Sequence, residues 1–268
     1  MQKMNQASAG IPSPVGQRGP GVSPEAAERI REWHEAASRA AGGDAGSEQT
    51  LTYQGMTVAV PPGMRRISAA SHLLGEAILA TVHAEDRVLD IGAGSGVNAI
   101  LAASLGARVV AVDLSARACD VARHNVQRTG LADRVDVRQS DLFSDVAGRF
   151  DLIVYEEPFC WRDREDPIAA VTSQEAVPAM MMFLRSAAGY LLPEGRMLLL
   201  LNPPGARDYL EQLSDESGLT ASLVAQERQI EDGRPVDFFA FRLAPRASVS
   251  AGEDDSWDIS LQGRARDK

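Results

Sequence analysis

The run Val88 to Gly96, which reads VLDIGAGSG, holds the residues whose types and spacing best suit ligand binding. An apolar strand is expected to break into three alternating glycines immediately before a helix. Glycines lack Cβ atoms, so such a loop can turn sharply and let a ligand approach the backbone, while the helix N-terminus presents free N–H groups. We therefore expect a cofactor to bind at this loop.

Two features of the loop indicate the charge of that ligand. Gly92, Gly94 and Gly96 give the spacing G-x-G-x-G, whereas nicotinamide dinucleotide sites use G-x-G-x-x-G. Asp90 stands before the first glycine, and its carboxylate would repel a pyrophosphate but attract a sulfonium or ammonium group. The loop therefore favours a positively charged cofactor over a dinucleotide.

With Asp90 and these glycines, the chain resembles the class I S-adenosylmethionine-dependent methyltransferases over roughly Asp86 to Leu243. The resemblance implies S-adenosylmethionine as the cofactor. It also implies that Asp113, which ends VVAVD, accepts hydrogen bonds from the ribose hydroxyls, a role suited to a carboxylate. Asp141 and Leu142 would lie near the adenine amine and ring. The cofactor-binding residues expected from this resemblance are Asp90, Gly92, Ala93, Gly94, Gly96, Asp113, Leu114, Asp141 and Leu142.

The acceptor site is expected in FDLIVYEEPFCW, from Phe150 to Trp161. The chain looks most like release-factor glutamine and ribosomal RNA guanine methyltransferases, and many family members that methylate nitrogen carry Asn-Pro-Pro-Tyr or Asp-Pro-Pro-Tyr here. Glu156 and Glu157 occupy its first two positions, so the usual group that orients a planar nitrogen is missing. We expect Glu156 or Glu157 to be catalytic, by accepting a proton or by aligning the nucleophile.

Aromatic residues near this motif are candidates for substrate binding. Phe159 and Trp161 would supply an apolar or cation–π wall, and Tyr53 would lie in a cap over the cofactor. The alternative for the acceptor motif is a solvent-exposed glutamate and a tryptophan that covers the core.

Other residues have a functional and a structural interpretation. His72 would act as a base or be structural, and Arg65 and Arg66 would line the cap or form a solvated pair. The run Met180 to Leu184 would be core or would shape a hydrophobic pocket. The two cysteines of the chain offer neither a metal cluster nor a disulfide framework, so no metal site is expected.

Composition restricts the class of acceptor. The formal net charge of −10 argues against RNA or DNA, since any such surface would have to be a local patch. We therefore expect N- or O-methylation of a small molecule or modified peptide. The alternatives are N-methylation of a protein side chain or RNA, and a noncatalytic adenosyl-ligand-binding protein. No membrane span or secretory signal is visible, so a cytoplasmic protein is expected, and a homo-oligomer remains open.

The element pattern predicts an α/β fold: a Rossmann-like, mostly parallel seven-stranded sheet with helices on both faces and an antiparallel C-terminal hairpin. We expect a flexible tail (1–22), an N-terminal cap with a helix and a hairpin (23–84), the cofactor-binding domain (85–245) and a second flexible tail (246–268). In the domain, the expected strands are 87–91, 108–113, 135–139, 150–155, 196–201, 221–230 and 236–243. The expected helices there are 97–105, 116–129, 178–192 and 206–217.

Overall fold

The computed structural model describes residues 49–53, 55–62, 64, 67, 69–156, 176–201, 206–231 and 234–246. The expected N-terminal tail and residues 23–48 of the expected cap lie outside these residues. So does the expected C-terminal tail beyond Arg246. The boundaries of the cap therefore stay a prediction.

Within the described residues, seven strands form one sheet in the order β5-β4-β3-β6-β7-β9-β8. The strands from β5 to β7 run parallel, and β9 and β8 are added antiparallel to them. This is the expected Rossmann-like class with an antiparallel edge. The strands are β3 (Arg87–Ile91), β4 (Arg108–Asp113), β5 (Val135–Gln139), β6 (Phe150–Glu156), β7 (Leu191–Leu201), β8 (Leu219–Glu231) and β9 (Arg234–Pro245).

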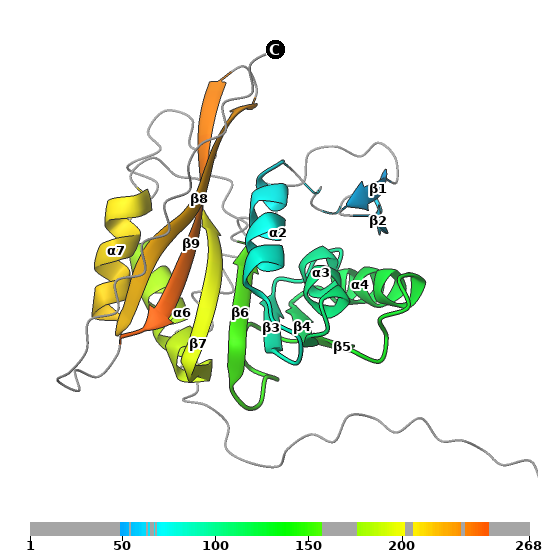
Figure 1. Ribbon diagram of the computed structural model, residues 1–268, viewed down its shortest axis with the longest axis horizontal. Coiled ribbons are helices and arrows are strands. Elements are labelled where there is room, and N and C mark those ends of the chain that lie inside the picture. The colour runs from blue at the N-terminus through cyan, green and yellow to red at the C-terminus, as the bar shows by residue number, and fades with distance from the viewer. Residues whose placement is uncertain are drawn as a thin grey trace, which may run out of the picture.

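Helices cover both faces of the sheet (Figure 1). They are α2 (Ala69–Thr81), α3 (Val97–Ser104) and α4 (Ala116–Arg128) on one face, and α6 (Ala176–Tyr190) and α7 (Ala206–Glu216) on the other. One hydrophobic cluster lies on each face of the sheet. Val88, Leu152 and Val154 pack with α2 and α3. On the other face, Leu89, Ile153 and Tyr155 pack with α6 and α7. Side chains alternate along each strand, so each strand contributes to both clusters.

The expected N-terminal hairpin is present as a separate two-stranded sheet of β1 (Gln49–Tyr53) and β2 (Met56–Val60). Gly55 in its turn has φ of 81°, a left-handed conformation that favours glycine. Val58, Ala59 and Val60 are buried, and β2 contacts α4. The hairpin therefore packs on the helix that follows the second core strand.

The boundary between α6 and β7 differs from the prediction. The helix was expected to continue to Leu192 and the strand to begin at Arg196, but α6 ends at Tyr190 and β7 begins at Leu191. Leu191 pairs with Phe150, and the register shifts between Phe150 and Leu152. Pairing with β6 therefore places in the strand residues whose apolar spacing would also suit a helix.

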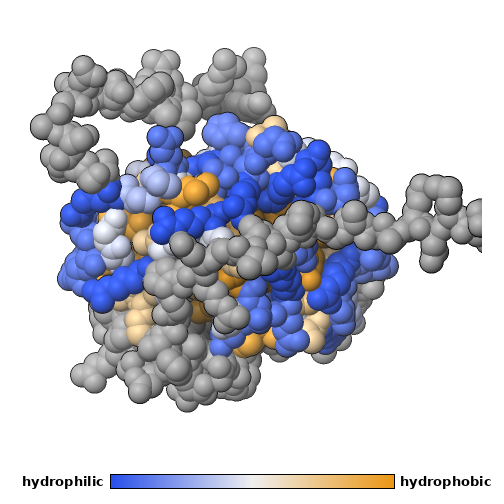
Figure 2. Space-filling model, turned by 90° about the horizontal axis from the view of Figure 1, so that it is seen from below, coloured by the Kyte–Doolittle hydropathy of each residue, from blue (hydrophilic) through white to orange (hydrophobic). Residues whose placement is uncertain are grey.

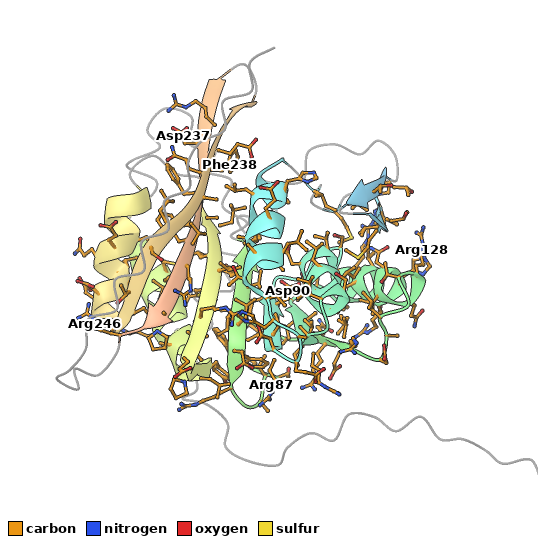
Figure 3. All side chains as sticks on the ribbon, in the orientation of Figure 1. Arg87, Asp90, Arg128, Asp237, Phe238 and Arg246 are labelled. Atoms are coloured by element: carbon orange, nitrogen blue, oxygen red, sulfur yellow. The ribbon has the colours of Figure 1, made fainter. Side chains whose placement is uncertain are left out.

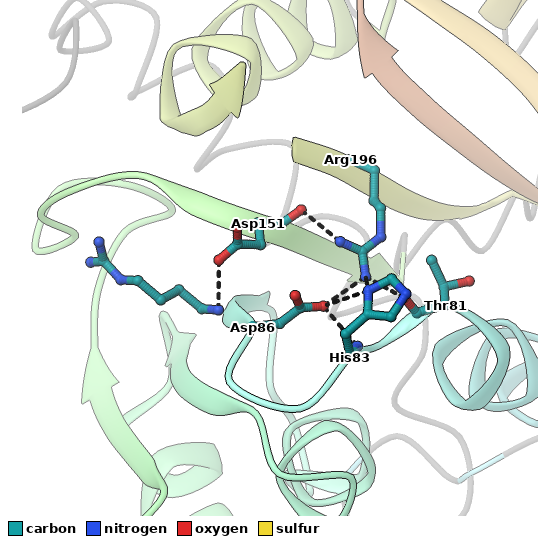
Figure 4. A network of polar contacts seen from close by, with 6 residues as sticks. Thr81, His83, Asp86, Asp151 and Arg196 are labelled. Carbon is teal, nitrogen blue, oxygen red and sulfur yellow. Dashed lines mark hydrogen bonds and ion pairs between the residues drawn. The ribbon is translucent and has the colours of Figure 1, made fainter. Parts of the chain in front are cut away.

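A polar network connects the amino ends of the central strands (Figure 4). Arg196 Nη2 donates to Asp86 Oδ2 at 2.7 Å and to the carbonyl of Thr81, and its Nη1 donates to the carbonyl of Asp151 at 3.2 Å. The Arg196 side chain is 8% exposed, so this charge is buried and paired. Seen from below, hydrophilic residues cover most of the coloured surface (Figure 2). None of the described helices is both long enough and apolar enough to cross a membrane.

Candidate active site

The glycine loop lies between β3 and α3, at the carboxyl end of the sheet. Gly92, Gly94 and Gly96 have φ values of 74°, 53° and 81°, so all three use the left-handed region. A Cβ on Gly92 would meet nothing within 4 Å, whereas one on Gly96 would lie 3.1 Å from Ala122 Cβ. Gly92 therefore leaves space for a ligand, and Gly96 allows α3 to begin close against α4.

Backbone contacts hold this loop against the neighbouring strand. The N–H groups of Gly92 and Ala93 both donate to the carbonyl of Val112 at 2.9 Å, and Gly96 N–H donates to the carbonyl of Ala93 at 2.7 Å. Ala93 is buried. Main-chain hydrogen bonds thus fix the loop against the end of β4.

Asp113 is the last residue of β4, beside the loop. Its Oδ2 accepts a hydrogen bond from Gly94 N–H at 2.9 Å, and its Oδ1 accepts one from Ser115 N–H at 2.9 Å. Burial raises the pKa of Asp113, while these two N–H donors act in the opposite direction. Each oxygen has a further lone pair, so an oriented carboxylate can still accept the two ribose hydroxyls.

The remaining cofactor-binding candidates follow the ends of β4 and β5; of these, Asp141 and Leu142 are the two expected near adenine. Leu114 is exposed, and its carbonyl accepts a hydrogen bond from Gln139 Nε2 at 3.0 Å. Leu142 is buried with φ of 50°, and its carbonyl accepts from Ser140 Oγ at 3.0 Å. Asp141 precedes it and is partly exposed. A left-handed leucine is uncommon, and hydrogen bonding by Ser140 maintains it at this edge.

Asp90 lies inside the molecule near the end of β3 (Figure 3). It is 1% exposed, and its Oδ2 accepts the N–H of Ala99 in the first turn of α3 at 3.1 Å. No partner for its Oδ1 is present among the described residues. A cationic cofactor above the loop would compensate this buried acceptor, so the residues present fit S-adenosylmethionine.

Of the expected acceptor residues, the structure describes Glu156, which is the last residue of β6. Its Oε1 accepts a hydrogen bond from Ser71 Oγ on α2 at 2.9 Å, and Ser71 is 3% exposed. Glu157, Phe159 and Trp161 lie outside the described residues, and so does the side chain of Tyr53. The roles proposed for these four residues stay predictions.

The remaining candidate residues differ in how far their side chains are buried. His72 is exposed on α2, next to the buried Ser71 that contacts Glu156. Met180 is 5% exposed and packs with Phe183 in the cluster beneath α6, as the core interpretation predicted. Arg65 and Arg66 lie outside the described residues. Among the described residues no cluster of His, Cys, Asp and Glu could hold a metal ion.

Sequence reasoning missed Ser71 and Asn125. Asn125 is fully buried on α4, where its Nδ2 donates to the carbonyls of Ala59 at 2.8 Å and Ser95 at 2.9 Å. It thereby joins the N-terminal hairpin to the cofactor loop. A polar residue within the buried face of α4, which also holds Ala122 and Val126, was the available signal.

Comparison with known proteins identifies the family of this site. The sequence model of the methyltransferase small domain matches residues 62–227, which is more than half of the chain. The chain belongs to the methyltransferase small domain family. The predicted class I methyltransferase relationship is confirmed, and with it S-adenosylmethionine as the cofactor.

Individual relatives share parts of this chain. The ribosomal protein L11 methyltransferase of Desulfitobacterium hafniense is 45% identical over 86 residues, which are 32% of this chain and 28% of that protein. The tRNA1(Val) (adenine(37)-N6)-methyltransferase of Parabacteroides distasonis is 30% identical over 158 residues, which are 56% of this chain and 65% of that protein. The chain spans about a quarter of the length of the L11 methyltransferases it matches.

A solved structure agrees in fold. The Thermus thermophilus 16S rRNA N2 G1207 methyltransferase, in complex with AdoMet and guanosine, has a TM-score of 0.56 and 22% identity; the match covers 74% of this chain and 50% of that chain. These names contradict the expectation that a nucleic-acid partner is unlikely. That expectation used the net charge of the whole chain, whereas nucleic-acid binding depends on the local surface.

Proposed function

We propose that this protein transfers a methyl group from S-adenosylmethionine to a nitrogen of an RNA base. The observation that carries the proposal is the position of Glu156, at the carboxyl end of β6 and held there by Ser71. The carboxyl ends of β3, β4 and β6 meet at one edge of the sheet, so this carboxylate stands beside the cofactor loop. The small-molecule acceptor expected from composition has less support.

The extent of each match favours RNA over protein as the acceptor. The L11 methyltransferase of D. hafniense matches 32% of this chain, whereas the tRNA adenine methyltransferase matches 56% of it. A short match with high identity is what the shared cofactor-binding core produces, and it carries little information about the acceptor. The longer match includes more of the chain on which the acceptor can be recognised.

The local surface of α4 also supports RNA binding. Its exposed side chains include Arg117, Arg123 and Arg128, together with His124 and one acid, Asp120. The helix begins directly after Asp113 and Leu114, at the cofactor edge, and extends to Arg128 at its far end (Figure 3). Arg117 and Arg128 lie on the same side of the helix, whereas Arg123 is paired with Asp120. Exposed arginines on a helix that begins at the cofactor edge suit a phosphate backbone, although the whole chain is acidic.

The chain's own residues do little covalent chemistry in this reaction. S-adenosylmethionine, which the glycine loop and Asp113 would hold, would supply an electrophilic methyl group on its sulfonium. In place of the usual orienting group of the motif, the Glu156 carboxylate accepts an N–H hydrogen bond from the base amine, which directs the nitrogen lone pair toward the methyl group. It then stands ready to accept the proton that the nitrogen loses.

The experiment is methyl-label transfer with methyl-labelled S-adenosylmethionine and an extract of cells that lack this protein, separated afterwards into RNA, protein and small-molecule fractions. We expect label in RNA, released as a methylated nucleoside after digestion. Glu156→Gln should reduce this transfer by roughly 100-fold or more, in line with loss of a general base. At pH 8 the variant should bind the cofactor normally.

Glu194→Gln is the matched control, because Glu194 is an exposed glutamate in β7. Glu157→Gln tests the second carboxylate of the motif in the same assay. Label in the protein fraction alone would favour a protein side chain as the acceptor. Label in small molecules alone, or wild-type transfer by both motif variants, would refute the proposed role of these carboxylates in RNA methylation.

A further inference from the structure

Asp90 and Glu156 lie on the same face of the sheet. Asp90 pairs with Val154 across β3 and β6, and Glu156 is two residues beyond Val154. Side chains alternate along a strand, so both carboxyl groups point to the face on which Val154 packs with α2 and α3. With strands about 4.8 Å apart and a rise of about 3.3 Å per residue, their Cα atoms are roughly 8 Å apart.

The environments of the two carboxyl groups differ. Asp90 is 1% exposed and accepts one backbone N–H, whereas Glu156 is partly exposed and accepts the hydroxyl of Ser71. Burial, followed by repulsion from Glu156, raises the pKa of Asp90 to about 7. Asp90 is the carboxyl group of this pair whose pKa is raised by burial, so the first proton taken up by the pair resides on Asp90.

The other elements around Asp90 supply no compensating positive side chain among the described residues. The charged groups that act on it are Glu156 from β6 and Asp113 from β4, and both disfavour its ionisation. From α3 it receives the N–H of Ala99, the one contact that favours the charged form. On α2, Ser71 contacts Glu156, while the neighbouring His72 is exposed.

We propose that Asp90 and Glu156 act as a carboxyl pair that holds one proton in the free protein and releases it when S-adenosylmethionine binds. The proposal rests on the cofactor part of the proposed function and is independent of the methyl acceptor. The Asp90 O–H bond breaks, the proton passes to the buffer, and the carboxylate that remains is compensated by the positive charge of the cofactor. Cofactor binding and deprotonation of the site are thereby one coupled equilibrium.

Isothermal titration calorimetry of the full chain with S-adenosylmethionine measures this coupling directly. Titrations in phosphate and in Tris, whose ionisation enthalpies differ, give the number of protons released. We expect about half a proton at pH 7, close to one at pH 6 and almost none at pH 8. The dissociation constant should rise roughly tenfold from pH 8 to pH 6, since only the ionised pair binds.

Variants separate this pair from other titrating groups. Glu156→Gln removes the repulsion, so Asp90 should ionise at lower pH and proton release at pH 7 should fall. Asp90→Asn should abolish it. His72→Gln is the control, because His72 follows Ser71 on α2, and this variant should release as many protons as the wild type.

Each outcome decides the proposal. Tight binding without proton release at pH 6 and 7 refutes the carboxyl pair and leaves the methyltransferase assignment standing. Loss of proton release in His72→Gln also refutes it, since the proton would then come from the histidine. Absence of any binding refutes the cofactor assignment, and the pair with it.

Discussion

Asn125 on α4 and Ala59 in β2 are joined by two hydrogen bonds. Asn125 Nδ2 donates to the carbonyl of Ala59 at 2.8 Å, and Ala59 N–H donates to Asn125 Oδ1 at 2.9 Å. The same amide donates to Ser95 in the cofactor loop. One side chain therefore connects the N-terminal hairpin, the helix after β4 and the loop that binds the cofactor.

Replacing Asn125 should destabilise the protein. Asn125→Leu keeps the branching of the side chain but leaves three buried backbone groups without their partner, so we expect the free energy of unfolding to fall by about 2–4 kcal/mol. Urea unfolding measures this change. Gln127→Leu, at an exposed position on the same helix, should cost less than about 0.5 kcal/mol. Equal effects of the two variants would contradict a connecting role for Asn125.

Asp113→Asn should weaken cofactor binding. One oxygen of the carboxylate becomes an amide donor, so a ribose hydroxyl loses its charged acceptor, and we expect a loss of about 1–3 kcal/mol in binding free energy. Calorimetry with S-adenosylmethionine measures it. Asp133→Asn, at an exposed position, provides the comparison. Unchanged affinity in Asp113→Asn would remove this residue from the site.

Gly96→Ala and Gly130→Ala form a matched pair. Both glycines are left-handed, with φ of 81° and 74°, but a Cβ on Gly130 meets nothing within 4 Å, whereas one on Gly96 meets Ala122 at 3.1 Å. Backbone strain should cost both variants about 1–2 kcal/mol of stability. Gly96→Ala should lose more, because α3 and α4 must separate. Equal losses of stability in thermal unfolding would show that the close contact between Gly96 and α4 does not contribute to stability.

Asp90 should make the stability of the free protein depend on pH. Burial, with repulsion from Glu156 as the second cause, raises its pKa from 3.8 to about 7, so the folded state holds the proton more tightly than the unfolded state. Its contribution is complete below pH 4 and is lost as pH rises to about 7. The loss is on the order of 2–4 kcal/mol.

Urea unfolding at pH 5, 6, 7 and 8 tests this dependence. Asp90→Asn cannot ionise at this position, so its stability should fall less than that of the wild type over the range. Asp133→Asn should follow the wild type. Parallel profiles for the wild type and Asp90→Asn would show that Asp90 is ionised throughout.

The local sequence pattern was sufficient to place the core strands that lead to the cofactor site. The core strands β3, β4 and β5 begin and end where their apolar runs predicted, and the glycine loop follows β3 as expected. The boundary between α6 and β7 was misplaced, because Leu191 continues the apolar spacing of the helix but pairs with Phe150. Choice of partner strand decided that boundary.

The sequence by itself determined the fold class, the cofactor loop and the carboxylate at the end of β4, since each depends on residues adjacent in the chain. Only the tertiary structure placed Ser71 against Glu156, 85 positions away, and Asn125 against Ala59, 66 positions away. It also decided which carboxyl group holds a proton. Burial and the distance between charges set a pKa, and both arise only when α2, α3 and the ends of β3 and β6 come together.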